Sequence, residues 1–590
     1  MAEPTNGEIA AALDELGDLY ELDGAIIHRI VAYRNAAKAV RDAPVSVTAL
    51  AREGRATELP GVGAIIQEKV LALADDGVIP AAAKLRAKFP PGLLEIMRLP
   101  GLGPKRARRL YDELSIDSLQ SLIAAAESQQ IRTLKGFGPK AEESILAAAT
   151  TAAAAAADPA NGDGSGRIVL NKALTVGEQL IAALREHPAA DRVELAGSAR
   201  RMTDSVKDLD VIATAHDPLA LANAAAALEL VESAQTPGEA GVRLRTHTGL
   251  KVDLRIVAPD QFGNLMQHFT GSKQHNMALR DGAVRKGLHV SEYGVLDDAT
   301  GETHRCERED QVYGLLGLQY IEPELRENRG ELEAAANGSL PELIELGDLK
   351  GDLHCHTTAS DGTASIEEMA LAARHAGYQY LAITDHSASF GFGDEVSPDR
   401  LRGQIDRIHE LSQSDAVGGL ELLAGSEVNI LPDGALDYDN ELLAELDWVV
   451  ASVHSSFAMD SASMTDRIVR AIENPYVDVI GHLSGRKIER RKPYEFDFGR
   501  VLEAAVATGT LLEINSAPDR RDLNDVHARA AAAAGIPIVI NCDAHRVGGF
   551  EVARYGIATA RRAWLSADAV ANTRPWSEVA RLRPRARAHA

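Results

Sequence analysis

The stretch Leu353–Gly362, with the sequence LHCHTTASDG, indicates the fold of the C-terminal half of the chain. His354 and His356 lie two residues apart on a predicted strand, so both imidazoles face the same way, and Asp361 follows in the loop. Seven such strands in a row predict a β/α barrel, because that fold collects its site at the carboxyl ends of its strands. The later strands end in side chains of the same metal-binding types: His386, Glu427, His454, His482, Glu513, and Asp543 with His545.

Histidines and carboxylates at matching places favour a metal cluster over a set of core residues. A single histidine at a strand end is more often a core residue, but six histidines with acidic companions make that interpretation a poor one. Mixed imidazole and carboxylate ligands suit Zn or Mn, with carboxylates favouring Mn, and clustered ions suit the hydrolysis of phosphoesters. Strand alternation turns Cys355 to the opposite face, so we do not count Cys355 or Cys542 as ligands.

The composition is that of a multidomain protein without a membrane span. A chain of 590 residues is too long for one core, and no apolar run approaches the roughly 20 residues that a span requires. The N-terminus is acidic and polar where a signal peptide is basic, and three scattered cysteines, Cys306, Cys355 and Cys542, are too few for a disulfide framework, so we expect a cytoplasmic protein. The net charge of −24 argues against non-specific coating of nucleic acid but permits local basic patches.

The first 150 residues contain a repeat that predicts contacts with the DNA backbone. The three copies are LPGVGAIIQEKV from Leu59, LPGLGPKRARRL from Leu99 and LKGFGPKAEESI from Leu134. In each copy two glycines let the backbone approach a ligand, and the helix that follows presents its N-terminus to a phosphate. This is the helix-hairpin-helix pattern, which grips DNA without reading its sequence; a glycine-rich turn without a ligand is the alternative. The predicted DNA-binding residues are Gly61, Gly63, Gly101, Gly103, Lys105, Gly136, Gly138 and Lys140.

Aspartates on neighbouring predicted strands indicate a second metal site. In VELAGSARRMTDSVKDLDVIATA, from Val193, Asp208 and Asp210 face one side of a strand, and Asp253 in GLKVDLRIVA can join them from another. Three carboxylates can hold two metals, one for the attacking oxygen and one for the leaving phosphate. A solvated strand end is the alternative, but the residues upstream offer amides, a hydroxyl and guanidinium groups to a triphosphate: Gly197, Ser198, Arg200 and Arg201.

This segment resembles the palm of family-X DNA polymerases. HFTGSKQHNMALR (His268–Arg280) is similar to that family's nucleotide-binding turn, and LGLQYIEPELREN (Leu316–Asn328) to the end of its thumb. The resemblance implies that Asp208 and Asp210 bind both metals, Mg²⁺ or Mn²⁺, and that Asp253 binds the catalytic one. It also implies nucleotide-binding roles: Gly197, Ser198 and Arg201 for the triphosphate, and Phe269, Gly271 and Asn276 for the sugar and base.

Some positions depart from the family's pattern. His268 stands where the better-known animal members have tyrosine, which puts discrimination against ribonucleotides in question. Met202 and Lys207 replace glycines, and we expect both to be tolerated because the spacing from Arg201 to Asp208 is unchanged.

The resemblance also implies a lyase nucleophile in the first hairpin. Lys69 falls where some relatives keep the lysine that forms a Schiff base with an abasic-site sugar, and Tyr33 falls at a supporting position. Ile65, however, replaces a lysine of those relatives. A lysine on a DNA-binding helix is more often a phosphate contact, so both roles of Lys69 stay open.

The C-terminal region resembles the polymerase-and-histidinol-phosphatase (PHP) domain, a distorted β/α barrel that usually holds three metals. The resemblance implies a cluster of Mn²⁺, Zn²⁺ or both. The basic loop GRKIERRKPY (Gly485–Tyr494) is expected to guide a DNA strand to this cluster, with a solvated loop as the alternative, and the final RLRPRARAHA is expected to be a disordered tail. The implied ligands are His354, His356, Asp361, His386, Glu427, His454, His482, Asp543 and His545.

The predicted fold class is multidomain α and α/β, with a helical helix-hairpin-helix N-terminal region, a nucleotidyltransferase-type mixed α/β palm and thumb, and a C-terminal distorted (β/α)7 barrel. We expect a lyase-like helical domain over 1–90, a fingers-like hairpin region over 91–150, a linker over 151–166, a palm over 167–260, a thumb over 261–335, the PHP domain over 336–575 and a basic tail over 576–590.

The order of these parts matches bacterial family-X polymerases. The resemblance implies gap-filling DNA repair synthesis and a metal-dependent 3′–5′ exonuclease, with gapped or primed DNA and dNTPs as partners, no membrane, and a monomeric chain. The alternatives are a PHP domain that acts mainly as an abasic endonuclease, 3′-phosphatase or small-molecule phosphatase, and a non-catalytic DNA-end-binding scaffold. Complete aspartate and histidine sets count against the scaffold.

Overall fold

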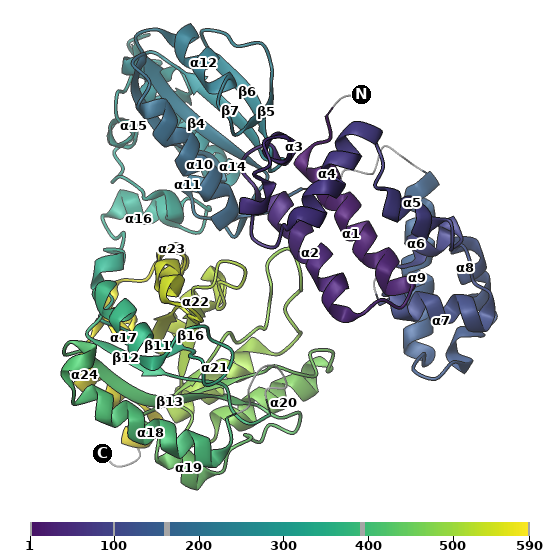
Figure 1. Ribbon diagram of the computed structural model, residues 1–590. Coiled ribbons are helices and arrows are strands. Elements are labelled where there is room, and N and C mark those ends of the chain that lie inside the picture. Colours follow the sequence, from purple (N-terminus) through teal and green to yellow (C-terminus); the bar gives the residue numbers. More distant parts are fainter. Residues whose placement is uncertain (1–2, 98, 100, 158–165, 390–395, 588–590) are drawn as a thin grey trace. The chain divides into compact units, whose positions relative to one another are not determined.

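The computed structural model describes residues 3–97, 99, 101–157, 166–389 and 396–587 (Figure 1). It divides into two compact units: Met1–Arg167, Thr175–Glu194 and Lys207–Ile256 form the first, and Ile168–Leu174, Leu195–Val206 and Val257–Ala590 form the second. None of the described helices is long and apolar enough to cross a membrane.

The N-terminal part of the first unit is helical and has two cores. Helices α1 (Asn6–Leu22), α2 (Ile27–Asp42), α3 (Val47–Arg52), α4 (Ala64–Asp76) and α5 (Pro80–Arg86) enclose one core that includes Leu13 and Val40. Helices α6 (Pro91–Met97), α7 (Pro104–Leu114), α8 (Leu119–Glu127) and α9 (Pro139–Ala157) enclose the other, which includes Leu110 and Phe137. The predicted helical hairpins are therefore confirmed.

The predicted linker over 151–166 is only partly described. Residues 151–157 continue helix α9, because the alanine run there is the best helix-forming composition. Its remaining predicted residues 158–165 lie outside the described part of the chain.

The first unit also contains the predicted palm sheet. Its strand order is β2 (Ala190–Leu195), β4 (Asp208–Ala215), β7 (Lys251–Ile256), β6 (Gly241–Thr246) and β5 (Val231–Ala234). Strands β4 and β7 run parallel, and their register places Asp210 opposite Asp253. The aspartates that the sequence separates by some forty residues thus occupy adjacent strands.

In the second unit, the thumb is held by a buried network of charges. It comprises α13 (Phe262–Thr270), α14 (Lys273–Val284), the antiparallel strands β8 (Leu288–Ser291), β9 (Gly294–Asp297) and β10 (Thr303–His304), α15 (Glu309–Leu315) and α16 (Glu331–Asn337). Glu309 accepts hydrogen bonds from fully buried Arg326 and from Arg200. These two guanidinium groups outweigh the effect of burial and lower the pKa of Glu309 to about 2.

The C-terminal part of the second unit is a barrel of parallel strands, as predicted (Figure 1, green to yellow). The strands follow chain order and the barrel nearly closes, since Cys355, the last residue of the first strand, forms a bridge to Ala544, which lies beyond the last strand. Leu353, Ala382, Val450 and Leu511 are among the side chains that fill the interior. The strands are β11 (Gly351–Cys355), β12 (Tyr380–Ile383), β13 (Glu421–Asn429), β14 (Trp448–Ser452), β15 (Val479–Ile480), β16 (Leu511–Asn515) and β17 (Ile538–Asn541).

Helices cover the outside of this barrel and pack on its strands through a large apolar core. Among them are α17 (Ile366–His375), α18 (Pro398–Ser412), α19 (Asn440–Ala444), α20 (Ser461–Ile472), α21 (Phe498–Thr508), α22 (Asp525–Ala533) and α23 (Ala553–Arg562).

The expectation of a disordered C-terminal tail is wrong for the described residues. Residues Trp576–Leu582 form α24 and Pro584–Arg587 form α25, and Trp576 packs on the interior cluster of the barrel, near Trp448. Arg585 donates a 2.7 Å hydrogen bond to Asp478 Oδ2, and Asp478 is fully buried. The basic composition of the tail suggested that its side chains are solvated. Arg585 is instead bound by the buried carboxylate of Asp478, which lies more than a hundred residues earlier in the chain. Residues 588–590 lie outside the described part.

Removal of the Arg585 side chain should destabilise the barrel. In Arg585→Ala the buried Asp478 carboxylate loses its cation, which should lower the free energy of unfolding by about 3 kcal/mol. All three tryptophans, Trp448, Trp564 and Trp576, lie after residue 440, so urea unfolding followed by tryptophan fluorescence reports on this part. Arg581→Ala, at an exposed position of α24, is the control. Equal unfolding midpoints for the two variants would contradict the prediction.

Candidate active sites

The predicted metal ligands of the barrel come together at the carboxyl ends of its strands. Three groups have ligand atoms that all lie within 4.8 Å of one another, and members shared between groups join them into one cluster. His354 lies within β11 and Glu427 within β13, whereas the other ligands lie in the turns that follow strands. The groups are His356, Asp361, His386 and His545; His354, His356 and Asp543; and His386, Glu427 and His454.

Glu427 is the centre of this cluster. Its side chain is 1% exposed, and its two oxygens lie 3.0 to 3.5 Å from ring nitrogens of five histidines. A carboxylate with both oxygens among imidazoles could hold metal ions together with those rings. The five histidines are His354, His356, His386, His454 and His482, so His482 also reaches the cluster.

The electrostatics of the cluster are those of a site for cations. Burial raises the pKa of Glu427, but His454, His354 and His386 outweigh it and hold that pKa well below its usual range. Burial, together with the neighbouring His386 and His545, lowers the pKa of His356 to about 4. Burial likewise lowers the pKa of His482 to about 4. Against the effect of burial, the carboxylates raise the pKa of His354 well above its usual value and the pKa values of His386 and His545 to about 9. The cluster thus combines ionised carboxylates with two neutral imidazoles and three that metal binding would have to deprotonate.

Several buried ligand atoms have no hydrogen-bond partner among the described residues. They include Nε2 of His354, both ring nitrogens of His356 and Oε1 of Glu427. Buried polar atoms without partners cost free energy unless a ligand satisfies them. The residues therefore fit a metal cluster.

Outer hydrogen bonds orient the ligands, and the sequence interpretation missed most of them. Glu513 Oε1 lies 2.7 Å from His354 Nδ1 and accepts a hydrogen bond from Asn541, and Glu513 Oε2 accepts one from the backbone N–H of His482. Such partners fix the ring and the tautomer of a ligating histidine. Glu513 had been placed at a strand end without a role. Asn429 does the same for His454 Nδ1, at 2.9 Å.

The two cysteines near the ligands point into packed surroundings. Cys355 Sγ lies 3.4 Å from Ala382 O, and Cys542 Sγ lies 3.6 Å from Phe550 O. Burial raises the pKa of both thiols well above its usual value. Both side chains belong to the core between strands and helices.

In the palm, the three predicted aspartates share one face of two paired strands. Asp210 lies opposite Asp253, and Asp208 is two residues earlier on β4. Asp253 lies 3.0 Å from Arg255 Nε and 3.4 Å from Arg243 Nε. An open pocket of about 540 Å³ adjoins Asp208 and Asp253. Among the described residues, the ligand atoms of the three aspartates do not form a group within 4.8 Å of one another.

The predicted nucleotide-binding residues belong to the second unit. Gly197 and Ser198 begin the short helix α11 (Gly197–Arg200), which presents backbone amides. Arg201 donates a 2.5 Å hydrogen bond to Thr270 O, and Asn276 donates one to His268 O, so these residues fix the turn around Gly271. Phe269 lies in the last turn of α13, with its ring centroid 5.3 Å from that of His268.

Met202, which replaces a glycine of the family, has a φ of 54°. That left-handed conformation costs a non-glycine residue about 1 to 2 kcal/mol. The spacing to Asp208 is kept, as expected, but at the price of a strained backbone.

The hairpin turns leave their backbones open to a ligand. Gly61, Gly101 and Gly136 have φ values of 79 to 88°, which only glycine adopts at little cost. The second glycines, Gly63, Gly103 and Gly138, have no such constraint, and a Cβ there would meet no atom within 4 Å. The free space at these turns and the exposed Lys105 and Lys140 beside them fit a phosphate backbone.

The predicted lyase site consists of Lys69 and Tyr33, and the two side chains differ in their exposure to solvent. Lys69 lies half-buried on α4, whereas Tyr33 is 5% exposed and stacks on Tyr20. The lyase role of Lys69 stays a prediction.

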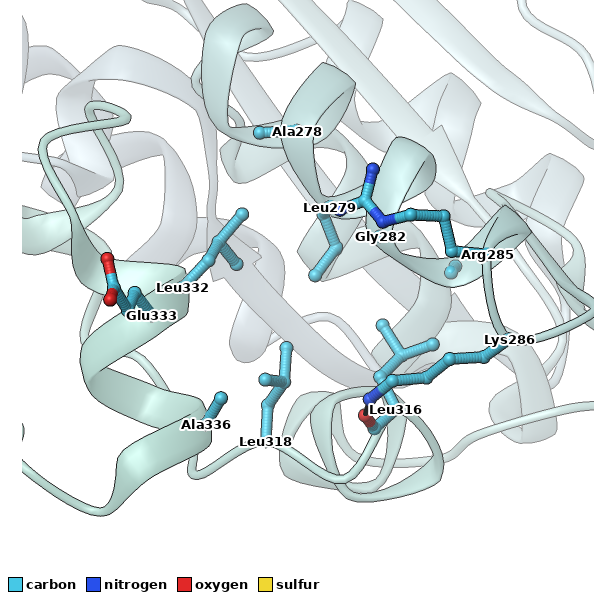
Figure 2. A pocket seen from close by; sticks show the side chains of 11 residues that line it. Ala278, Leu279, Gly282, Arg285, Lys286, Leu316, Leu318, Leu332, Glu333 and Ala336 are labelled. Carbon is cyan, nitrogen blue, oxygen red and sulfur yellow. Dashed lines mark hydrogen bonds between the residues drawn. The ribbon is translucent and has the colours of Figure 1, made fainter.

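The thumb carries an apolar pocket of about 410 Å³, shown in Figure 2. Leucines and alanines from α14, α16 and the loop around Leu316 line it, with Arg285, Lys286 and Glu333 at its edge. Its lining offers neither a metal-ligand set nor a nucleophile and base pair, so we assign no chemistry to it.

Comparison with known proteins agrees with this architecture. Four families match: a helix-hairpin-helix domain over residues 4–79, a SAM-like helix-hairpin-helix tandem over 93–151, the DNA polymerase beta thumb over 265–327 and the PHP domain over 352–517. The chain is 36% identical to the DNA polymerase/3′-5′ exonuclease PolX of Bacillus subtilis, over 97% of this chain and 98% of that protein.

The barrel alone is similar to smaller proteins. A probable phosphatase of Caldanaerobacter subterraneus subsp. tengcongensis is 34% identical over 35% of this chain and 78% of its own length. A probable phosphatase of Thermoanaerobacter sp. is 33% identical over 38% of this chain and 89% of its own length.

Hairpin domains, a palm with paired aspartates, the polymerase thumb and a PHP barrel define a family-X DNA polymerase with a PHP domain. Because the similarity extends over nearly the whole of both chains, this protein belongs to the family of the bacterial polymerase/exonuclease PolX.

Replacement of Glu513 should weaken metal binding without removing a ligand. In Glu513→Gln the carboxylate that orients His354 becomes an amide, so we expect the affinity for Mn²⁺ or Zn²⁺ to fall by about 10- to 100-fold. Competition with a chelator measures it. Glu503→Gln, at an exposed position of α21, is the control. An unchanged affinity would show that Glu513 does not support the site.

Proposed function

We propose that this family-X polymerase fills short gaps in DNA during repair and that its PHP barrel removes nucleotides from 3′ ends. The observation that carries the proposal is the presence in one chain of both residue sets: the paired aspartates of β4 and β7, and the histidine and carboxylate cluster around Glu427. Gapped or primed DNA and dNTPs are the proposed substrates, and the hairpin turns support the first of these.

In the palm, Asp208 and Asp210 would hold both ions and Asp253 one of them. Mg²⁺ or Mn²⁺ supplies the positive charge that activates the 3′ hydroxyl and stabilises the leaving pyrophosphate. The side chains of the protein would bind the nucleotide and orient it. Ser198 and Arg201 would hold the triphosphate, and Phe269, Gly271 and Asn276 would contact the sugar and base.

In the barrel, the nine cluster residues would hold Mn²⁺, Zn²⁺ or both, and bound ions supply an activated water for phosphodiester hydrolysis. The side chains orient one another: Glu513 holds the ring of His354, and Asn429 that of His454. With these bonds at Nδ1, the Nε2 atom of each ring faces Glu427, at 3.3 Å for His354 and 3.2 Å for His454. We further propose that the protein is cytoplasmic and acts as a monomer.

A second candidate function for the barrel is phosphomonoester hydrolysis. The similarity of the barrel to probable phosphatases favours it. Release of phosphate from a 3′-phosphate primer, compared with shortening of a 3′-hydroxyl primer, separates the two activities.

The palm aspartates are tested by Asp208→Asn combined with Asp210→Asn. With Mn²⁺ and a 5′-labelled primer at a one-nucleotide gap, we expect extension to fall by at least about a thousandfold, since metal-held charge stabilisation carries the chemistry. Shortening without dNTPs should remain. Loss of both activities in this variant would contradict two separate sites.

The barrel cluster is tested by His354→Ala combined with His356→Ala. The variant should lose primer shortening and bound metal at the barrel, because two ligands are gone, and should extend the primer at the normal rate. Circular dichroism checks that the barrel is folded. Continued digestion by a folded variant would refute the assignment of the nuclease to the barrel.

A further inference from the structure

Arg520 differs from the other arginines of low exposure. Its side chain is 15% exposed, and no described residue accepts a hydrogen bond from its guanidinium group; the nearest carboxylate oxygen, Asp543 Oδ2, is 3.8 Å from Nε. By contrast, Arg561 binds Glu324 at 2.7 Å and Arg562 binds Glu327 at 2.9 Å. None of its guanidinium nitrogens is among the buried atoms without a partner, so solvent reaches the group and an anion can reach it too.

Arg520 stands at the edge of the metal cluster. Asp543 Oδ1 lies 3.2 Å from His356 Nε2, whereas its other oxygen accepts a hydrogen bond from Asn515 and faces Arg520. The guanidinium therefore adjoins a proposed ligand without being part of the ligand set. An anion that approaches the cluster on this side meets Arg520.

Two further cations lie close to Arg520. Burial lowers the pKa of Lys487, and the charge of Arg520 lowers it further. The pKa of Arg491 is lowered in the same way. Lys487 Nζ lies 3.0 Å from Asp519, and the Arg491 guanidinium lies over the ring of Phe457 at 4.0 Å. Because Asp519 directly precedes Arg520, this ion pair places Lys487 on the Arg520 side of the cluster, where a bound anion would meet both cations.

The geometry points to a phosphodiester clamp formed by Arg520 and Lys487 at the mouth of the metal centre. The inference rests on the proposed nuclease function and names the part of the DNA that the barrel holds, the phosphate of the terminal linkage. The guanidinium fork suits two oxygens of that phosphate, and the lysine adds a point charge. Bases are not read by this pair, so the clamp predicts little dependence on sequence.

The small phosphodiester p-nitrophenyl thymidine 5′-phosphate tests the clamp in the full chain, because it is too short to engage the hairpin turns. For Arg520→Gln we expect KM to rise about tenfold or more, with kcat and bound metal within about twofold of the unchanged protein. Arg520→Lys keeps the positive charge but loses the forked guanidinium group, so its KM should lie between those of Arg520→Gln and the unchanged protein. Arg561→Gln, at a similar exposure of 18%, is the matched control and should leave KM unchanged.

Binding without catalysis gives a second readout. Anisotropy of a fluorescent thymidine trinucleotide with EDTA-treated protein should show weaker affinity for Arg520→Gln and a smaller dependence on salt, by about one unit of slope. Equal affinity and equal KM in Arg520→Gln and the unchanged protein would overturn the clamp. So would a loss of bound metal with no change in trinucleotide affinity, since Arg520 would then only neutralise Asp543.

The outcomes separate the clamp from the proposed function. If the unchanged protein binds the trinucleotide but cleaves neither it nor the small ester, and Arg520→Gln loses the binding, the clamp stands and the nuclease proposal fails. If the unchanged protein cleaves and Arg520→Gln cleaves with the same KM, the nuclease proposal stands and the clamp fails.

Discussion

The barrel site depends on the burial of one carboxylate, Glu427, among five imidazoles. A buried carboxylate without compensation costs several kcal/mol. The imidazoles cannot compensate it by all becoming charged, because they would repel one another; burial and such neighbours lower the pKa of His356 to about 4. Without metal ions the charge is balanced by protons on other imidazoles: against the effect of burial, the neighbouring carboxylates raise the pKa of His354 well above its usual value and the pKa values of His386 and His545 to about 9. Bound cations would take the place of these protons. The strand ends of the whole barrel serve to bring these groups to one place.

A second buried carboxylate lies at the opposite end of the barrel, and its charge is compensated by an arginine. Asp478, just before β15, is fully buried, and burial raises its pKa to about 6, although Arg585 opposes that rise. The cation comes from α25 rather than from a metal ion. Trp576 of the neighbouring α24 adds apolar contact with the interior. The C-terminal arginines are therefore part of the barrel, and the charge that makes them look like a solvated tail is the charge that the barrel uses.

The sequence predicted well those features that depend on local order. Strand alternation and position at a strand end identified the histidine and carboxylate ligands, since both follow from neighbours a few residues away. Features that join distant parts were missed. His354 and Glu513 are 159 residues apart, and Asp478 and Arg585 are 107 residues apart. A strand pattern says on which face a side chain lies, but not which other strand supplies its partner. For the same reason the sequence did not indicate a role for Arg520, since only the fold shows that its guanidinium group lies beside Asp543 without a hydrogen-bond acceptor among the described residues.

The loop Gly485–Tyr494 explains how cations can be held beside the metal centre at small entropic cost. Arg486 binds Asp204 at 2.7 Å, and Glu489 accepts a hydrogen bond from Ser205, so one side of the loop is bonded to residues 204–205, which precede β4. From the same loop, Lys487 binds Asp519, the residue directly before Arg520. Side chains on a fastened loop lose less freedom when they bind than side chains on a free one, and preorganisation of this kind strengthens binding without new contacts. A solvated loop of the same composition would carry the same charge but would have to be ordered each time that DNA bound.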